Sequence, residues 1–124
     1  MRKLFLVGSL FLLTGLLPAG EKKLMHCFAF TAIKEATDAD WKAFQAATDA
    51  LPKKMPGVVT RVWLGKLRRP LSVGGDVRQY GVCMEMPDEA ALKAYADHPA
   101  HKSWVEAYSK VRVEGTTTFD ILGQ

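Results

Sequence analysis

The residues best suited to chemistry stand around one proline, in the segment from Tyr95 to His101. Two histidines, His98 and His101, flank Pro99 in this segment. Imidazole titrates near neutral pH, so a histidine can act as a general base without a large pKa shift. Tyr95 lies one helical turn before the break, and its hydroxyl could donate a hydrogen bond to a developing oxyanion. The pattern predicts His101 as a base and Tyr95 as an oxyanion stabiliser.

The proline also predicts how these residues are positioned. Proline breaks a helix but suits the first turn of a new one, so we expect His98 to cap a helix that begins at Pro99. His101 then lies in the first turn, where the positive helix end keeps its imidazole neutral. Two other interpretations remain open. In one, the histidines only satisfy backbone groups at the break while Tyr95 fills core; in the other, the site binds a ligand without turnover.

Hydrophobic periodicity predicts the elements that hold this segment. In the first strand, His26, Phe28 and Phe30 alternate with Met25, Cys27 and Ala29. In the third strand, Tyr80, Val82, Met84 and Met86 share one face. We expect strands at 24–30, 58–65, 80–86 and 111–122, an irregular loop at 66–79, and helices that begin at Thr37, Asp88 and Pro99.

The resulting order, β-α-β-β-α-β, predicts an α+β, ferredoxin-like fold with a four-stranded antiparallel sheet and its helices on one face. The other face would then be bare. In the first strand that face carries Met25, Cys27 and Ala29, none of which is charged. A second copy is the economical cover, so we expect a homodimer in which two sheets pack face to face as a dimeric α+β barrel.

Aromatic residues of the sheet and helices could together line an apolar cavity. Three histidines could suit zinc, but His98 and His101 straddle the proline turn and no acidic or cysteine ligand is poised beside them. No phosphate loop, nucleophile elbow or nucleotide fingerprint is present. We therefore predict no metal and no cofactor.

The first twenty residues differ from the rest. A basic start, an apolar run over 4–17 and the small residues 18–20 are typical of a cleaved signal peptide. The run is shorter than the roughly 20 residues of a membrane span, although a retained anchor is the alternative. We expect residues 21–124 to form one exported domain, periplasmic or secreted. Removal of Arg2 and Lys3 lowers the net charge from +4 to +2, which does not favour nucleic-acid binding.

Two cysteines, Cys27 and Cys83, remain in the predicted domain, each in a predicted strand. An oxidising compartment permits a disulfide, but a bridge needs α-carbons within about 7 Å. We expect buried free thiols, with a disulfide as the alternative.

Four segments resemble the stress-responsive dimeric A/B-barrel family. They are Met25-His26-Cys27-Phe28, Leu51-Pro52-Lys53-Lys54-Met55-Pro56-Gly57-Val58, Tyr95-Ala96-Asp97-His98-Pro99-Ala100-His101 and Thr118-Phe119-Asp120. The resemblance covers about residues 24–122 and implies a dimeric barrel. In one plant member, olivetolic acid cyclase, a histidine base and a tyrosine act on a polyketide thioester.

The matching residues here are His101 and Tyr95, while His26 and Tyr80 match pocket-lining positions. Two departures weigh against the same substrate. Tyr80 stands where the cyclase has histidine, and export separates the chain from intracellular thioesters.

Together these observations predict an exported protein that binds a small apolar or aromatic molecule between sheet and helices. The alternatives are a lyase or cyclase that uses His101 and Tyr95, and a structural stress-related dimer without ligand. The residues expected to line the binding site are His26, Phe28, Phe44, Tyr80, Val82 and Trp104.

Overall fold

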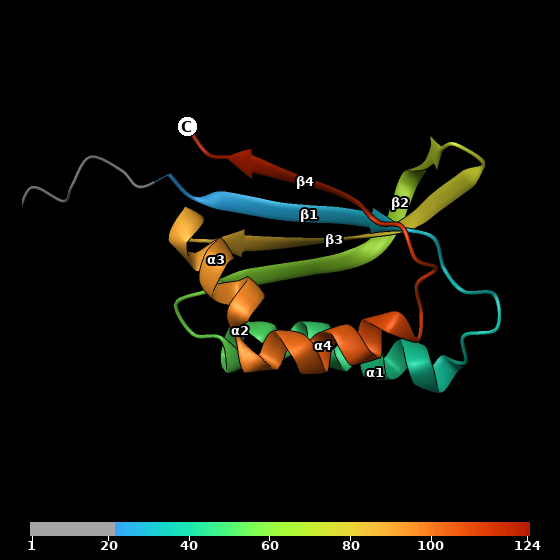
Figure 1. The fold of residues 1–124 in the computed structure, drawn as a ribbon, viewed down its shortest axis with the longest axis horizontal. Coiled ribbons are helices and arrows are strands. Elements are labelled where there is room, and N and C mark those ends of the chain that lie inside the picture. Colours follow the sequence, from blue (N-terminus) through green and yellow to red (C-terminus); the bar gives the residue numbers. More distant parts are fainter. Residues whose placement is uncertain (1–21) are drawn as a thin grey trace, which may run out of the picture.

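The protein folds into one sheet with four helices packed beneath it (Figure 1). The computed structural model describes residues 22–124, so the predicted signal peptide lies outside the described residues. The strands are β1 (Leu24–Phe30), β2 (Arg61–Val73), β3 (Asp76–Met86) and β4 (Thr117–Leu122), and the helices are α1 (Asp38–Asp49), α2 (Leu51–Lys54), α3 (Glu89–Asp97) and α4 (Pro99–Ser109).

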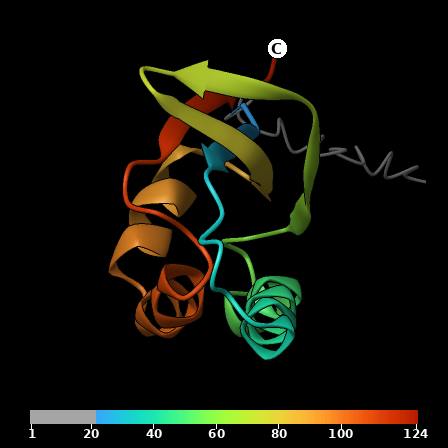
Figure 2. The ribbon, with the colours of Figure 1, turned by 90° about the vertical axis from the view of Figure 1, so that its right-hand side faces the viewer.

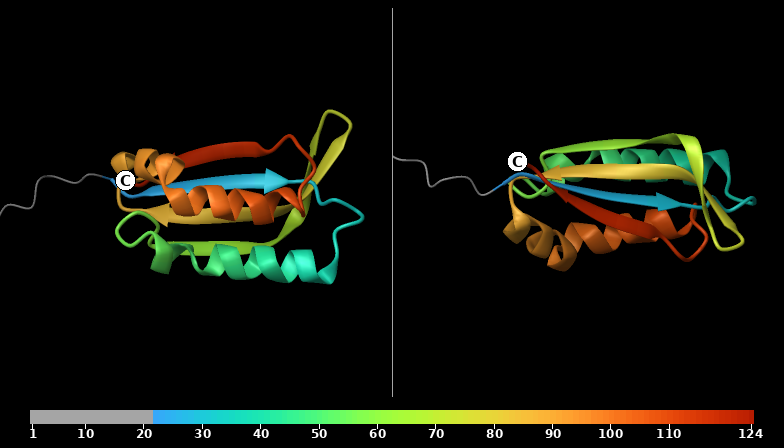
Figure 3. Two further views of the ribbon diagram at one scale, coloured as in Figure 1. Left: turned by 60° about the horizontal axis from the view of Figure 1, so that its bottom comes forward. Right: turned by 90° about the horizontal axis from the view of Figure 1, so that it is seen from above.

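The strand order is β2-β3-β1-β4, and all neighbouring strands are antiparallel. Seen end-on, the helices lie on one side of the curved sheet, with α1 and α4 next to each other (Figure 2). The view from above looks onto the strands with the helices behind them (Figure 3). The predicted ferredoxin-like α+β fold is confirmed.

Side-chain caps set the starts of the three long helices. The Thr37 hydroxyl accepts from the amide of Asp40 at 3.1 Å, and the Asp88 carboxylate accepts from the amide of Ala91 at 2.8 Å. These bonds satisfy amide groups that have no partner within a helix. At the proline, Nδ1 of His98 accepts from the amide of Ala100 at 3.0 Å, so α3 and α4 meet at the cap that the sequence predicts.

The two faces of the sheet follow from the alternation of its strands. Register pairs Phe30 with Tyr80 and Phe28 with Val82, which places all four side chains on the helix-covered face. There they join the core of the domain. The fully buried large side chains of that core include Phe30, Phe44, Leu51, Met55, Val82, Met84 and Met86.

Residues 66–79 differ from the predicted loop. β2 and β3 continue through them as a hairpin that turns at Gly74-Gly75, with φ of +61° at Gly74. Charged residues and Pro70 obscured the alternation of Leu71 and Val73, although a proline is tolerated in an edge strand such as β2. A register shift between Lys66 and Leu71 bends the hairpin away from the sheet (Figure 1).

The last strand is shorter than the predicted 111–122. The chain from Val111 to Thr116 forms a connection with one bridge between Arg112 and Ala32, and β4 begins at Thr117. Gly115, with φ of +97°, supplies the bend before the strand proper.

Cys27 and Cys83 form a disulfide, which corrects the expectation of free thiols. The two residues face each other across β1 and β3, and their α-carbons are 4.2 Å apart. They lie on the face opposite the helices, as alternation predicts, so the bridge ties together the two central strands.

The face opposite the helices, called here the open face, is largely apolar. The disulfide lies in a row that runs across the sheet between Trp63 of β2 and Phe119 of β4. Trp63 is 75% exposed and Phe119 is 47% exposed. Large apolar side chains so exposed are unusual for a face that meets only water.

Candidate functional site

A cleft between β1, β4 and the helices α3 and α4 brings together the chemically active residues. Its volume is about 170 Å³, and its lining is His26, Phe28, Tyr95, His101, Trp104, Val105, Tyr108, Arg112, Thr116 and Thr118. A larger depression of about 710 Å³ shares His26, Tyr95 and His101 with it. These three residues therefore line both spaces.

Three different elements position this trio. Strand alternation turns His26 toward the helices, the last turn of α3 carries Tyr95, and the first turn of α4 carries His101. The ring centres of Tyr95 and His101 are 4.5 Å apart in an edge-on arrangement. The ring of His26 lies 5.8 Å from that of Tyr95. The structure thus brings the predicted base and donor into contact, with a second histidine beside them.

Asp120 of β4 orients His26. Register places the two residues opposite each other, and Nδ1 of His26 lies 2.5 Å from Oδ1 of Asp120. A carboxylate can only accept, so the proton of this hydrogen bond belongs to Nδ1. Nε2 of His26 is then free of that bond. Sequence reasoning noted Asp120 only within a family motif; the alternation of β4 was the signal that would have paired it with His26.

Burial sets the protonation states of His101 and Tyr95. It is the main cause that lowers the pKa of His101 below its ordinary value, and the neighbouring His26 lowers it further. Burial likewise raises the pKa of Tyr95 far above its ordinary value. At neutral pH, His101 is therefore an uncharged imidazole that can accept a proton. Tyr95 keeps its hydroxyl proton and can donate a hydrogen bond.

The far end of the cleft carries a cation that the sequence analysis did not single out. The guanidinium of Arg112 stacks on the ring of Tyr108, 4.6 Å from its centre. The Tyr108 hydroxyl shares a hydrogen bond of 3.2 Å with Thr116. Nε of Arg112 is buried and has no hydrogen-bond partner among the described residues. The isolated bridge to Ala32, just beyond the end of β1, holds this segment and could not be read from periodicity.

The other predicted site residues divide into two groups. Phe28 and Trp104 line the cleft, with ring centres 5.6 Å apart. Val82 and Phe44 are almost fully buried in the core and line no described cavity.

Tyr80 lies elsewhere, in a separate depression of about 370 Å³ together with Lys34 and Lys66. Its register partner is Phe30, four residues along β1 from His26, and this spacing separates it from the trio. Among the described residues, Tyr80 and His101 therefore line separate spaces.

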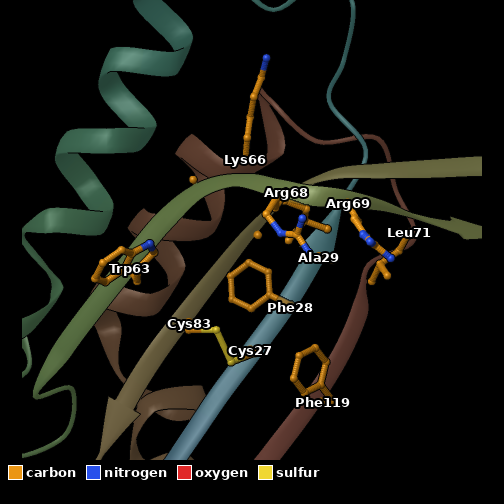
Figure 4. Close-up of a pocket in the computed structure, with 13 residues that line it drawn as sticks. Cys27, Phe28, Ala29, Trp63, Lys66, Arg68, Arg69, Leu71, Cys83 and Phe119 are labelled. Atoms are coloured by element: carbon orange, nitrogen blue, oxygen red, sulfur yellow. A yellow bond between two sulfur atoms is a disulfide. The ribbon is translucent and has the colours of Figure 1, made fainter.

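A second hollow, of about 330 Å³, lies on the open face (Figure 4). Its floor lacks side-chain bulk because Gly65, Gly81 and Ala29 form one row across three strands. Arg68 and Arg69 stand on its wall, and it contains no histidine, carboxylate or tyrosine. This hollow is larger than the cleft, but it offers no group that could exchange a proton at neutral pH.

Metal binding finds no support in the described part of the chain. No group of three or more histidine, cysteine, aspartate or glutamate side chains within residues 22–124 could hold an ion. His98 uses Nδ1 as a helix cap.

Among residues 22–124, no helix is long and apolar enough to cross a membrane.

These features define a ferredoxin-like α+β domain with an acid–base cleft beside one edge of its sheet. The sequence model of the stress responsive A/B barrel domain matches residues 24–122. The chain therefore belongs to this family, as its motifs predict. No curated protein is significantly similar to it in sequence.

Solved structures share the fold at low sequence identity. A dimeric ferredoxin-like protein of unknown function from Jannaschia sp. CCS1 is 24% identical, with a TM-score of 0.64 over 80% of this chain and 97% of that one. The hydroxynitrile lyase from Passiflora edulis is 9% identical, with a TM-score of 0.68 over 85% and 96%. A cofactor-independent oxygenase from Streptomyces nogalater is 16% identical, with a TM-score of 0.52 over 83% and 92%.

Proposed function

We propose that the protein is an acid–base enzyme that binds a small aromatic carbonyl compound in the cleft and removes a proton from the carbon beside the carbonyl. The contact between the uncharged imidazole of His101 and the hydroxyl-bearing ring of Tyr95 carries the proposal. The aromatic rings of Phe28, Trp104 and Tyr108 supply flat apolar walls for a ring-bearing substrate.

In the proposed step, the imidazole of His101 takes the proton as the C–H bond breaks. The electron pair moves onto the carbonyl oxygen, which becomes an enolate stabilised by the Tyr95 hydroxyl. The imidazolium then returns a proton to carbon, or the enolate attacks another electrophile. Asp120 fixes the ring of His26, so that Nε2 can contact the bound compound. A lyase or cyclase reaction would begin with this proton transfer.

Two structural neighbours support a catalytic use of this fold. One is named a hydroxynitrile lyase and the other a cofactor-independent oxygenase. Their low identity relates them to this chain by fold alone, so they support the class of activity and leave the substrate to the residues of the cleft.

We propose further that the enzyme is an exported homodimer. The exposed apolar side chains of the open face support a second copy as its cover, and similar structures are described as dimeric. The signal-like residues 1–20 support export. So does the disulfide between Cys27 and Cys83, because disulfides persist mainly in oxidising compartments.

Deuterium exchange tests the proposed reaction. The protein is incubated with acetophenone in D₂O, and exchange of the methyl protons is followed by NMR. Wild type should accelerate exchange, and His101→Gln should slow it by about 100-fold because the base is lost. Tyr95→Phe should also slow exchange, through loss of the oxyanion donor. The control is His98→Asn, which removes a neighbouring imidazole but keeps a capping side chain.

Equal exchange by wild type and His101→Gln would overturn the acid–base assignment. Binding without turnover is the second candidate, favoured by the aromatic walls of the cleft. A probe that binds the wild type but undergoes no catalysed exchange would support that candidate instead.

A further inference from the structure

Arg112 is the feature of the cleft that the proposed reaction does not use. Its guanidinium lines the cleft, held against the face of the Tyr108 ring. The ion pairs found among residues 22–124 do not include it, and its buried Nε has no hydrogen-bond partner there. The other two guanidinium nitrogens are not buried and have no hydrogen bond among these residues, so their donors are available to a ligand in the cleft.

The position of Arg112 relative to the trio constrains such a ligand. His101 and Tyr108 are seven residues apart on α4, so about 10 Å of helix separates the reactive end of the cleft from the ring that holds the cation. A cavity of about 150 Å³ is large enough for benzene, and this cleft measures about 170 Å³. One aromatic ring therefore fits between the two ends.

Guanidinium is well suited to bind a carboxylate. Its planar fork donates two parallel hydrogen bonds to a carboxylate, and such charge-assisted pairs are the strong ones. The hydroxyls of Thr116 and Thr118 line the same cleft and can donate to the same oxygens. At the other end, Asp120 would repel a carboxylate placed beside His26. The charges of the cleft thus orient an anionic ligand in one direction.

We infer that the substrate is an aromatic carboxylic acid whose carboxylate binds Arg112 while its carbonyl and acidic carbon face Tyr95 and His101. The reaction part of this inference rests on the proposed function, but the binding part does not. Arg112 is a binding residue in this assignment, and it fixes which end of the substrate meets the base.

A matched pair of probes tests the inference. 4-Acetylbenzoate carries a carboxylate and a carbonyl at opposite ends of one ring, and 4-acetylbenzamide has the same shape without the charge. Wild type should bind the benzoate at least 10-fold more tightly by titration calorimetry. Arg112→Gln should abolish that preference while it keeps the affinity for the benzamide, and Arg112→Lys should recover only part because the fork is lost.

Arg61→Gln is the control for removal of a positive charge. Arg61 pairs with Glu85 at 2.8 Å, next to the open face and away from the cleft, so this variant should keep the preference. Retained binding of the benzamide shows that Arg112→Gln is folded. Equal binding of both probes by wild type overturns the inference, and so does an unchanged preference in Arg112→Gln.

Exchange of the acetyl protons separates the two proposals. Catalysed exchange in both probes, without a preference for the benzoate, would leave the acid–base function standing and remove the role of Arg112. A benzoate preference that depends on Arg112 but shows no exchange would leave the binding inference standing and remove the acid–base function.

Discussion

The two faces of the sheet are built from the same strands, yet they differ in what covers them. The helix-covered face packs Phe28 and Phe30 against α1 and α4, and it leaves the cleft of His26, Tyr95 and His101 at the β4 edge. The open face carries Trp63, Phe119 and a disulfide, with no helix over them. One face completes its core within the chain, and the other leaves large apolar side chains exposed.

The difference shows where chemistry can be placed in such a small domain. Histidines at the edge of a closed core are partly dehydrated, and that burial holds His101 neutral. Trp63 and Phe119 on the open face have no such environment, since they are 75% and 47% exposed. The larger hollow lies on that face, and the smaller cleft contains the residues that we propose transfer a proton.

The largest expected effect comes from truncating one aromatic side chain on each face and comparing the loss of unfolding free energy. Phe30→Ala removes a fully buried ring and should lower the free energy of unfolding by about 3–5 kcal/mol, since it leaves a cavity in the core. Phe119→Ala, on the open face, should act through association. In urea unfolding, the loss in Phe30→Ala should be independent of protein concentration, and the loss in Phe119→Ala should depend on it. Equal, concentration-independent losses would contradict the distinction between the faces.

The disulfide should contribute nearly as much as a core ring. The bridge joins residues 56 positions apart, and so restricts the unfolded chain. Replacement of both Cys27 and Cys83 by alanine should lower the free energy of unfolding by about 3 kcal/mol, measured by urea denaturation. Dithiothreitol should destabilise the wild type by a similar amount and leave the double variant unchanged. Full stability of the reduced wild type would contradict a structural role.

The proposed association of two copies can be tested by placing one positive charge on the open face. Trp63→Lys places an ammonium on the open face where the most exposed aromatic ring now lies. Aromatic anchors of interfaces typically cost about 2 kcal/mol or more when removed, so the dimer should dissociate at least 10-fold more readily in analytical ultracentrifugation. Lys102→Ala, on the exposed side of α4, is the control. An unchanged dissociation constant would place the interface elsewhere.

The smallest expected effect belongs to the cleft and concerns pH. The folded state lowers the pKa of His101, so the unfolded chain binds more protons as the pH falls below the ordinary value of about 6.5. This contribution is present above that pH and is lost progressively below it. Stability of wild type should therefore fall more between pH 7.5 and 5.5 than that of His101→Gln. Parallel curves in thermal unfolding would show that burial leaves His101 unperturbed.

The fold was largely predictable because its signals are local. The threonine and aspartate caps, the proline after His98 and the alternation of β1 each act over a few residues, and each gives the observed element. The prediction was wrong for residues 66–79, where strand pairing overrode a charged sequence with a proline. Pairing between strands is a property of two segments, and neither shows it alone.

The sequence by itself determined the helix ends that hold Tyr95 and His101, because caps, breaks and alternation depend on near neighbours. Only the tertiary structure decided that Asp120 meets His26 across 94 positions, that Cys27 meets Cys83, and that Arg112 returns to the cleft. These contacts depend on strand register and on where the chain after α4 comes back to the sheet. Register is fixed by the packing of the whole sheet against its helices, so it becomes defined only when the chain has folded.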